Sequence, residues 1–352
     1  MEHFRIGIIG AGAISERHLN SYRQIPAVKV CSICDVNEAT AKARAQAYGI
    51  EKYYTDAMDI ITDPEIDAVS IVTPTFTHKN LVIAALEHGK HVLCEKPPAL
   101  NAKEAAMCEE VAKRTGKLLM YGFVVRFSKE TTFLKDYIAA GALGKIYYAE
   151  LARIARSFRI GGWFVNKELS GGGALIDSVI HQLDMALYLM GHPKVHSVKG
   201  FTSHEIADLP YKMKGNGKGW NSADTNSYSH EVESLAGGLI RFEDGSSLYL
   251  KTSWALNSTK PGTFVELCGT DGGAILDNGA VKLVTVDESG YYLESAPVLR
   301  DEVVVFDREI AHFVDCCLGK AECICKPEEG TYIMQIIDAI YKSAETGKEV
   351  VF

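Results

Sequence analysis

Short apolar runs alternate with segments of helical periodicity over the first 120 or so residues of the chain. The runs expected to be strands read RIGIIGAG, VKVCSICD, AVSIVTP, HVLCEKP and KLLMYGF, and helices are expected between them at 15–24, 38–48, 78–88 and 103–114. Strands this continuously apolar are buried on both faces, which is typical of a parallel sheet between two layers of helices. The pattern therefore predicts an α/β domain with a doubly wound Rossmann sheet.

The pattern changes after Phe123. Helices are expected at 129–139, 174–190 and 327–345, and several runs alternate apolar with polar residues: HSVKGFT, SLAGGLIRF, SSLYLKTSW, TFVELCGT and VKLVTV. Such alternation predicts a large, open, mostly antiparallel sheet in an α+β domain. We expect a Rossmann domain at 1–123 and an α+β domain at 124–352, whose last helix is a candidate to pack back on the first domain.

Composition narrows the class of protein. A chain of 352 residues exceeds what one hydrophobic core usually organises, so its length favours two domains. Its 37 basic and 45 acidic residues give a formal net charge of −8, which argues against a nucleic-acid partner. No apolar run reaches the roughly 18 residues of a membrane span. The start MEHFRIGIIG lacks the pattern of a secretory signal, and nine cysteines suggest free thiols, so we expect a cytoplasmic protein.

A glycine-rich turn follows the first expected strand and reads Gly10-Ala11-Gly12-Ala13-Ile14-Ser15. Gly10 permits the tight turn, and Gly12 lets the backbone approach a pyrophosphate at the start of a helix. Ser15 stands where the dinucleotide-binding fingerprint has its third glycine, a position that mainly needs a small side chain. Asp35 closes the second strand, where an acid accepts hydrogen bonds from the adenosine ribose. No arginine follows directly for a 2′-phosphate, so NAD is favoured over NADP.

Two further strand ends carry candidate site residues. In a doubly wound sheet, ligands bind outside the carboxyl ends of the strands, where Val72-Thr73-Pro74 and Glu95-Lys96-Pro97 both fall. A lysine there can donate to a substrate hydroxyl and to the nicotinamide ribose, and its charge favours a developing alkoxide. The alternative is a Glu-Lys pair on a solvated rim.

The segment GGGALIDSVIHQLDMALYLMG places ionisable groups on an otherwise apolar helix. Asp177 and His181 are four apart and share one helix face, and Asp184 lies near the same side. Such groups are costly there unless they meet a cavity or a partner. A satisfied Asp-His pair on the helix surface is the alternative.

Taken together, these residues resemble the Gfo/Idh/MocA oxidoreductases, the glucose-fructose oxidoreductase and inositol dehydrogenase group. The likeness spans essentially the whole chain and rests on the glycine turn, PTFTH, Glu95-Lys96-Pro97, GFVVRF, Gly171-Gly172-Gly173 followed by Asp177 and His181, and FEDGS. It implies oxidation of a sugar or polyol carbinol with NAD or NADP, or the reverse. His181 would be the base, Lys96 would hold the reacting oxygen, and Asp177 would bind an adjacent hydroxyl. The Lys-Pro peptide is often cis in the family, and we expect the same at Lys96-Pro97.

The resemblance also implies binding residues and an assembly. The cofactor set would comprise Gly10, Gly12, Ala13, Ile14, Asp35, Thr73, Pro74, Thr75, His78, Glu95, Lys96 and Arg126. The substrate set would comprise Lys96, Arg126, Trp163, Asn166, Asp177 and His181. A domain-junction salt bridge is the alternative for Arg126, and a core position the alternative for Trp163. Relatives commonly form dimers or tetramers, so we expect a homodimer or homotetramer that binds a small sugar, polyol or glycoside.

The cysteines and one long loop stay outside this interpretation. Cys316, Cys317, Cys323 and Cys325 resemble a metal cluster only in count, because their close spacing lacks a usual zinc pattern, so we predict no metal site. Cys31 and Cys34 form a C-x-x-C inside an expected core strand and are expected to be buried thiols. The loop at 203–226, rich in Gly, Lys and Asn, is either a binding loop or a surface excursion.

Three functions remain open at this point. The leading one is an NAD-dependent dehydrogenase that oxidises a secondary hydroxyl of a sugar, cyclic polyol or glycoside to the ketone. The second is a glycoside-cleaving or eliminating enzyme that retains its NAD through turnover. The third is a non-catalytic sugar sensor that binds dinucleotide, against which the presence of Lys96, Asp177 and His181 together speaks.

Overall fold

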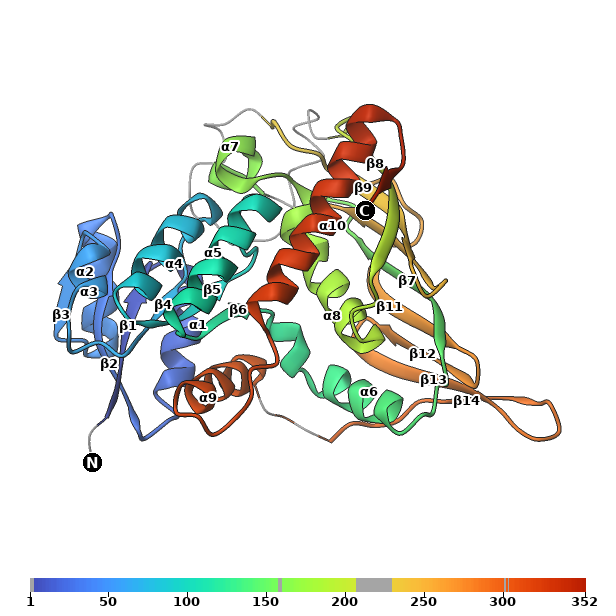
Figure 1. Cartoon of the computed structure of the whole chain (residues 1–352), viewed down its shortest axis with the longest axis horizontal. Coiled ribbons are helices and arrows are strands. Elements are labelled where there is room, and N and C mark those ends of the chain that lie inside the picture. Colours follow the sequence, from blue (N-terminus) through green and yellow to red (C-terminus); the bar gives the residue numbers. More distant parts are fainter. Residues whose placement is uncertain (1–2, 158–159, 207–229, 301, 303) are drawn as a thin grey trace. The chain divides into compact units, whose positions relative to one another are not determined.

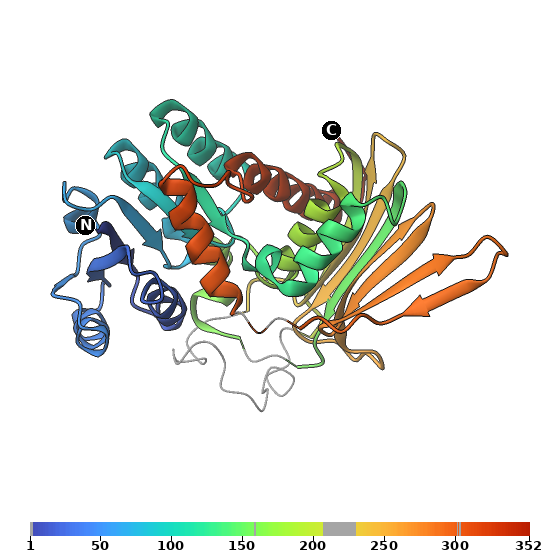
Figure 2. The same cartoon turned by 90° about the horizontal axis from the view of Figure 1, so that it is seen from below.

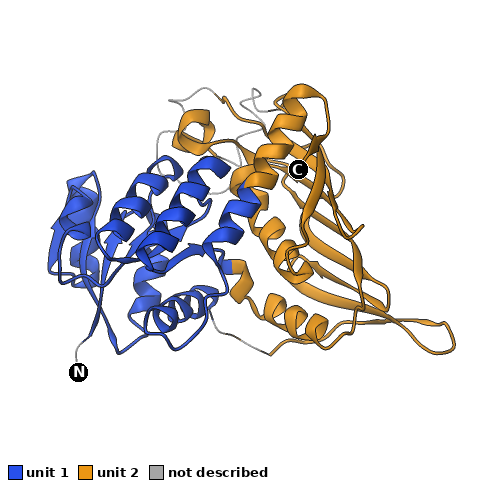
Figure 3. Ribbon diagram, viewed as in Figure 1, with its two compact units in different colours: residues 1–124, 303–334 blue, residues 125–302, 335–352 orange. Residues whose placement is uncertain are grey.

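The computed structural model describes residues 3–157, 160–206, 230–300, 302 and 304–352, so most of the loop predicted at 203–226 lies outside the described residues. The chain forms two compact units (Figure 3). Unit 1 comprises residues 1–124 and 303–334, and unit 2 comprises residues 125–302 and 335–352. Segment 303–334 therefore belongs with the first unit, although it follows the second along the chain. Within the described stretches, none of the helices combines the length and the apolar character needed to cross a membrane.

Unit 1 is built on a six-stranded sheet with the order β3-β2-β1-β4-β5-β6 (Figure 1). The strands, in that order, are Lys52–Tyr54, Val28–Cys34, Phe4–Ile9, Ala68–Ile71, His91–Glu95 and Leu119–Gly122, and every pairing is parallel. The helices between them are α1 (Ala13–Tyr22), α2 (Glu38–Tyr48), α3 (Met58–Ile61), α4 (His78–Glu87) and α5 (Ala102–Thr115). The predicted Rossmann sheet is confirmed. Its strand order reverses between β1 and β4, which is where such folds bind dinucleotides.

Two helices from the end of the chain complete unit 1. Helix α9 (Val305–Cys317) packs along α1, where the Ser21 hydroxyl donates to Asp307 at 2.6 Å and the Phe306 ring lies 6.0 Å from that of His18. Helix α10 (Pro327–Thr346) follows, and its first turns belong to unit 1. The sequence analysis predicted α10 and missed α9.

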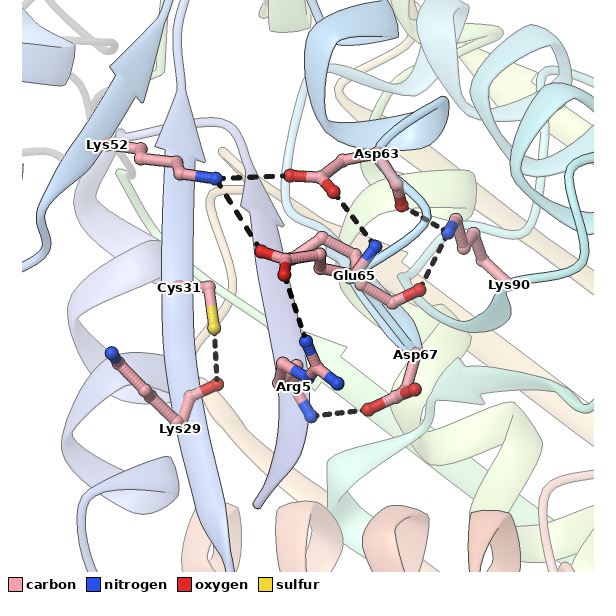
Figure 4. Close-up of polar contacts among 9 residues, drawn as sticks. Arg5, Lys29, Cys31, Lys52, Asp63, Glu65, Asp67 and Lys90 are labelled. Atoms are coloured by element: carbon pink, nitrogen blue, oxygen red, sulfur yellow. Dashed lines mark hydrogen bonds and ion pairs between the residues drawn. The ribbon is translucent and has the colours of Figure 1, made fainter. Parts of the chain in front are cut away.

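Polar contacts hold the amino-terminal edge of this sheet together (Figure 4). The Lys90 ammonium, on a residue that is 5% exposed, donates to the carbonyls of Asp63 and Ile66 at 2.5 and 2.7 Å. Cys31 is only half-buried and donates to the Lys29 carbonyl at 3.6 Å, so the expected buried thiol holds for Cys34 alone. A polar pocket at this edge contains none of the predicted site residues. The polar contacts at this edge therefore stabilise the sheet and lie apart from the predicted site residues.

Unit 2 is built on a nine-stranded sheet with the order β14-β13-β12-β11-β7-β10-β9-β8-β15. The strands, in chain order from β7, are Ile146–Ile154, Val195–Ser203, Leu235–Phe242, Ser247–Ser253, Gly262–Gly269, Gly272–Asp277, Ala280–Val286, Tyr292–Ser295 and Val350–Val351. All neighbours are antiparallel except β7 and β10, so the predicted mostly antiparallel sheet is confirmed. Helices α6 (Lys129–Ala139) and α8 (Ile180–Met190) lie on one of its faces (Figure 2).

Candidate active site

The glycine turn between β1 and α1 has the geometry that a dinucleotide needs. Gly10 has a φ of +104°, and a Cβ there would lie 2.6 Å from the Val72 carbonyl oxygen, so only glycine fits. Gly12 is the N-cap of α1 without a side-chain cap, and a Cβ there would meet nothing within 4 Å. The chain at the start of α1 is therefore uncrowded at Gly12, which suits the close approach of a pyrophosphate. Ser15 is buried and donates its hydroxyl to the Gly12 carbonyl at 2.7 Å, which fits its predicted role as a small packing residue.

Asp35 is fixed at the end of β2 by two backbone amides. The Ala11 amide donates to Oδ2 at 2.9 Å, and the Asn37 amide donates to Oδ1 at 2.9 Å. These bonds join the carboxylate to the glycine turn and leave each oxygen a further lone pair for a ribose hydroxyl. Sequence reasoning missed Arg44, whose guanidinium donates to the Ala11 carbonyl at 3.3 Å and pairs with Glu16. That arginine is engaged with the turn itself.

The end of β4 adjoins the same turn. The Thr73 methyl would lie 3.1 Å from a Cβ at Gly10. Thr75 is buried in a short 3-10 helix, and Pro74 is half-buried. His78, predicted to contact the cofactor, is 1% exposed, and its ring nitrogens lie 2.9 Å from the Thr73 carbonyl and 2.8 Å from the Pro97 carbonyl. The ring therefore links two backbone loops, which supports a positioning role in place of direct contact with cofactor.

The charge state of His78 depends on two opposed influences. Two carbonyl acceptors favour a ring with both nitrogens protonated and raise its pKa, whereas complete burial lowers the pKa. Burial has the larger effect. A neutral ring donates to only one carbonyl at a time, so the second contact is a close approach without a hydrogen.

The Glu95-Lys96-Pro97 segment leaves β5 at the same edge of the sheet. The Lys96–Pro97 peptide is cis, as predicted. Glu95 is 9% exposed and turns inward, where Oε1 lies 3.0 Å from Nε2 of the fully buried His18. Its Oε2 accepts the Lys96 amide at 3.2 Å. Glu95 therefore anchors the segment, while Lys96 remains partly exposed beside it. His18 was not among the predicted site residues.

In unit 2, the segment that carries Asp177 and His181 differs from the single regular helix predicted at 174–190. Residues Leu175–Val179 form a π-helical turn, and α8 begins at Ile180. Such widened turns are frequent at functional sites. Across residues 172–187, all of which the structure describes, only Asp177 and His181 are not buried. The two predicted catalytic residues are thus the accessible positions of an otherwise buried stretch at 172–187.

Buried partners that the sequence did not reveal hold this helix start. The carboxylate of Glu233, which is 3% exposed, accepts the amides of Gly173 and Leu175 at 2.9 Å each and the Tyr341 hydroxyl at 3.0 Å. Burial raises the pKa of Glu233, and the amide hydrogen bonds oppose that shift. A Cβ at Gly172 would lie 2.1 Å from the Tyr341 hydroxyl oxygen. Gly172 is therefore required for close packing.

A second buried chain reaches Asp177 directly. The Trp254 indole donates to the Ser178 hydroxyl at 2.7 Å, and that hydroxyl donates to Asp177 Oδ2 at 3.1 Å. Trp254 is 2% exposed. The carboxylate of Asp177 is therefore oriented from behind by the core of unit 2.

Arg126, predicted to bind cofactor and substrate, lies in an enclosed environment that supports its alternative role. It is 2% exposed, its Nε donates to Asp184 Oδ2 at 2.9 Å, and its Nη2 donates to Asp184 Oδ1 at 2.5 Å. The guanidinium also lies 4.7 Å from the centroid of the Tyr188 ring. This is a buried bidentate ion pair inside unit 2, and it is similar in kind to the salt bridge considered as the alternative role of Arg126. A side chain this enclosed does not support contact with cofactor or substrate.

The aromatic segment before the triple glycine gives a mixed result. Trp163 is half-buried and stacks on Phe164, with ring centroids 3.8 Å apart. It remains available as a surface for a sugar ring. The Asn166 side chain accepts the Leu169 amide at 3.1 Å and caps α7 (Lys167–Ser170), so its local role is that of a helix cap.

Comparison with known proteins places this site in context. The family model described as oxidoreductase family, NAD-binding Rossmann fold, matches residues 4–123, and the one described as oxidoreductase family, C-terminal alpha/beta domain, matches residues 135–352. D-glucoside 3-dehydrogenase of Escherichia coli (strain K12) is 34% identical over 353 residues, covering 98% of this chain and 97% of that protein. The NAD(+) scyllo-inositol 2-dehydrogenase of Bacillus subtilis (strain 168) is 36% identical over 203 residues, covering 57% of this chain and 58% of that protein.

Solved structures support the fold. A levoglucosan dehydrogenase in complex with NADH and levoglucosan has a TM-score of 0.86 at 22% identity and covers 99% of each chain. The predicted NAD-binding Rossmann domain and oxidoreductase class are confirmed by the family models. Since those two models together match nearly all of the sequence, the chain belongs to the Gfo/Idh/MocA family of oxidoreductases.

Proposed function

We propose that this protein is an NAD-dependent dehydrogenase that oxidises a secondary hydroxyl of a sugar, cyclic polyol or glycoside to the ketone. The observation that carries the proposal is the pairing of Asp177 and His181 as the only accessible positions of a buried helix start. The relatives that are D-glucoside and inositol dehydrogenases support the substrate class. Neither alternative function is favoured by a specific feature of the chain.

The proposed chemistry is a proton transfer and a hydride transfer from one carbinol. His181 takes the hydroxyl proton, and because Nδ1 of its ring is buried, we assign this step to Nε2. The carbon-oxygen double bond forms as the C–H hydride leaves. NAD, when bound, supplies the hydride acceptor. Lys96 holds the reacting oxygen and stabilises its partial charge, and Asp177 binds a neighbouring hydroxyl.

The proposed binding residues follow from the local geometry. Those proposed to contact NAD are Gly10, Gly12, Ala13, Ile14, Asp35, Thr73, Pro74, Thr75 and Lys96. Glu95 and His78 position the loops that carry them, because their side chains bond within unit 1. Trp163 remains a proposed substrate contact. We also propose that the enzyme works in the cytoplasm as a homodimer or homotetramer.

The first experiment is the near-ultraviolet absorbance of reduced nicotinamide after purified protein and NAD are mixed with inositols, monosaccharides and glycosides, with NADP in parallel. We expect steady growth of the signal with NAD and at least one substrate. With that substrate, His181→Ala should lower kcat by about 10²- to 10⁴-fold, the usual contribution of a general base, and leave the Kd for NAD within about twofold.

His196→Ala is the matched control, because His196 is exposed on β8 of the same unit. Full activity of His181→Ala would remove His181 from the mechanism. No signal with any substrate, together with NAD released on denaturation, would favour the enzyme that retains its cofactor or the sensor.

A further inference from the structure

Three metal-ligating side chains meet in unit 1, outside every residue assigned above. His312 and Cys316 are four apart on α9, and Cys323 lies in the connection between α9 and α10. The Cys316 sulfur is 3.3 Å from His312 Nε2, and the ligand atoms of all three residues lie within 4.8 Å of one another. Each residue is half-buried, so an ion from solvent can reach the cluster.

The connection after α9 is folded so that it returns Cys323 to the helix. Gly319, with a φ of +69°, turns the chain just beyond the end of α9. The Ile324 amide then donates to His312 Nε2 at 3.2 Å, and the Cys323 thiol donates to the Cys325 carbonyl at 3.4 Å. Cys325 itself is fully buried. The loop is therefore anchored directly after Cys323, and the third ligand is held beside the other two by the fold.

The imidazole is already in the form that metals bind. Because Nε2 accepts a hydrogen bond from the Ile324 amide, Nε2 is unprotonated and the ring proton resides on Nδ1. Metal ligation uses such a neutral ring nitrogen. A bound ion would take over this lone pair from the amide hydrogen, and the two thiols would lose their protons to solvent.

The separations suit a small tetrahedral ion. Bonds of about 2.3 Å to sulfur and about 2.0 Å to nitrogen place the sulfur and nitrogen ligands of a tetrahedron roughly 3.5 Å apart and two sulfurs roughly 3.8 Å apart. The distance of 3.3 Å between Cys316 Sγ and His312 Nε2 is already close to the sulfur–nitrogen edge. The remaining separations, none above 4.8 Å, need to close by at most about 1.3 Å. A Cys₂His donor set selects zinc over hard cations such as magnesium or calcium.

We propose that His312, Cys316 and Cys323 form a zinc site, with the fourth position taken by water. The site ties the end of α9 to the chain that leads into α10, so its role is to hold unit 1 together. This departs from the prediction of no metal site, which considered the cysteines alone. His312 lies one helical turn before Cys316, and nothing in the linear spacing shows that Cys323 folds back to both.

The test is a titration of the full chain, reduced and freed of metal, with Co²⁺ and then Zn²⁺. We expect one equivalent of Co²⁺ to give thiolate charge-transfer absorbance and the intense visible bands of a tetrahedral site, and Zn²⁺ to remove both. Cys316→Ser and Cys323→Ser should each weaken Co²⁺ binding more than tenfold. His312→Gln should do the same while keeping an acceptor for the Ile324 amide, so the loop is preserved.

Cys268→Ser is the matched control, since Cys268 is a half-buried thiol in unit 2 and should leave the titration unchanged. Unaltered NAD binding reports that each variant is folded. Two results would overturn the proposal: a Co²⁺ spectrum that is absent or identical in the wild type and the Cys316→Ser variant, or a Cys316–Cys323 disulfide in freshly purified protein that binds no metal after reduction.

Discussion

At the scale of single residues, unit 1 encloses a carboxyl group without a partner. Glu309 on α9 is completely buried, and neither of its carboxyl oxygens has a hydrogen-bond partner among the residues that the structure describes. Burial, and then the nearby charge of Glu95, raise the pKa of Glu309 well above its usual range. Glu95 keeps its own partners, His18 and the Lys96 amide. Of the two acids, Glu309 is the one held in its neutral form, because a buried charge without a partner is far more costly than a neutral carboxyl.

Glu309→Gln should therefore change how stability depends on pH. The folded-state pKa of Glu309 lies above the unfolded value of roughly 4.3. Its favourable contribution to the free energy of unfolding is therefore complete below about pH 4.3 and is lost as the pH rises toward the folded-state pKa. Glutamine cannot ionise. We expect the free energy of unfolding of Glu309→Gln to gain on the wild type by about 1.4 kcal/mol per pH unit above that value. Urea unfolding of both proteins at pH 5, 6 and 7 measures this, with exposed Glu288→Gln as control; parallel curves would contradict it.

At the scale of elements, the apolar runs of the Rossmann domain predicted β1, β2, β4, β5 and β6 and their parallel arrangement in one sheet. Helices α2 and α6 agree with their predicted ranges to the residue. Helix α9 was missed although Ile310, Phe313 and Val314 recur at helical spacing, and its burial comes from α1, which is distant in sequence. Continuous, locally encoded patterns were thus readable, whereas elements defined by distant partners were not.

The candidate site shows the same division. The glycine turn, Asp35 and the shared face of Asp177 and His181 followed from local motifs, and the cis peptide at Lys96–Pro97 followed from the family resemblance. The enclosure of Arg126 by Asp184 depends on residues 58 positions apart. The hydrogen bonds that Glu233 accepts come from amides 58 and 60 positions away. No spacing rule shows such pairs in one sequence.

Gly173 is the element-scale position where this packing can be tested. A Cβ there would lie 2.1 Å from the Glu233 backbone oxygen, so Gly173→Ala must push the start of the π-helical turn away from Glu233. We expect a loss of about 1–3 kcal/mol in the free energy of unfolding, as in other overpacked sites, and a lower kcat because Asp177 and His181 shift with the turn. Urea unfolding and steady-state kinetics measure both effects.

Gly273→Ala is the matched control for that change. Gly273 lies in β12 of the same unit, and a Cβ there would come no closer than 3.5 Å to any neighbour. If the two alanine variants behaved alike, the close approach to Glu233 would not be the constraint that keeps position 173 a glycine.

At the scale of the whole molecule, the open face of the nine-stranded sheet carries apolar side chains. Leu239 in β9 is 39% exposed and Phe201 in β8 is 41% exposed, whereas their strand neighbours on the helix-covered face, such as Ile240 and Val198, are buried. Tyr249 is paired with Leu239 across β9 and β10. A face of this kind, mixed in polarity and spread over several strands, fits an interface between copies of the chain.

Leu239→Glu tests whether this face forms the expected homo-oligomer. A stable interface buries about 1,200–2,000 Å² in total, and a carboxylate at the centre of such a surface is desolvated without a partner, so association should weaken by at least tenfold. Light scattering coupled to size exclusion should show the wild type at two or four times 38.5 kDa and the variant shifted toward that mass. Met107→Glu, at an equally exposed apolar residue on α5 in unit 1, should leave the mass unchanged. Leu239 lies outside the set of residues proposed to bind NAD or substrate. A dissociated variant that retained NAD binding would therefore locate the interface on this face. An unaltered oligomer would require that a different surface forms the interface.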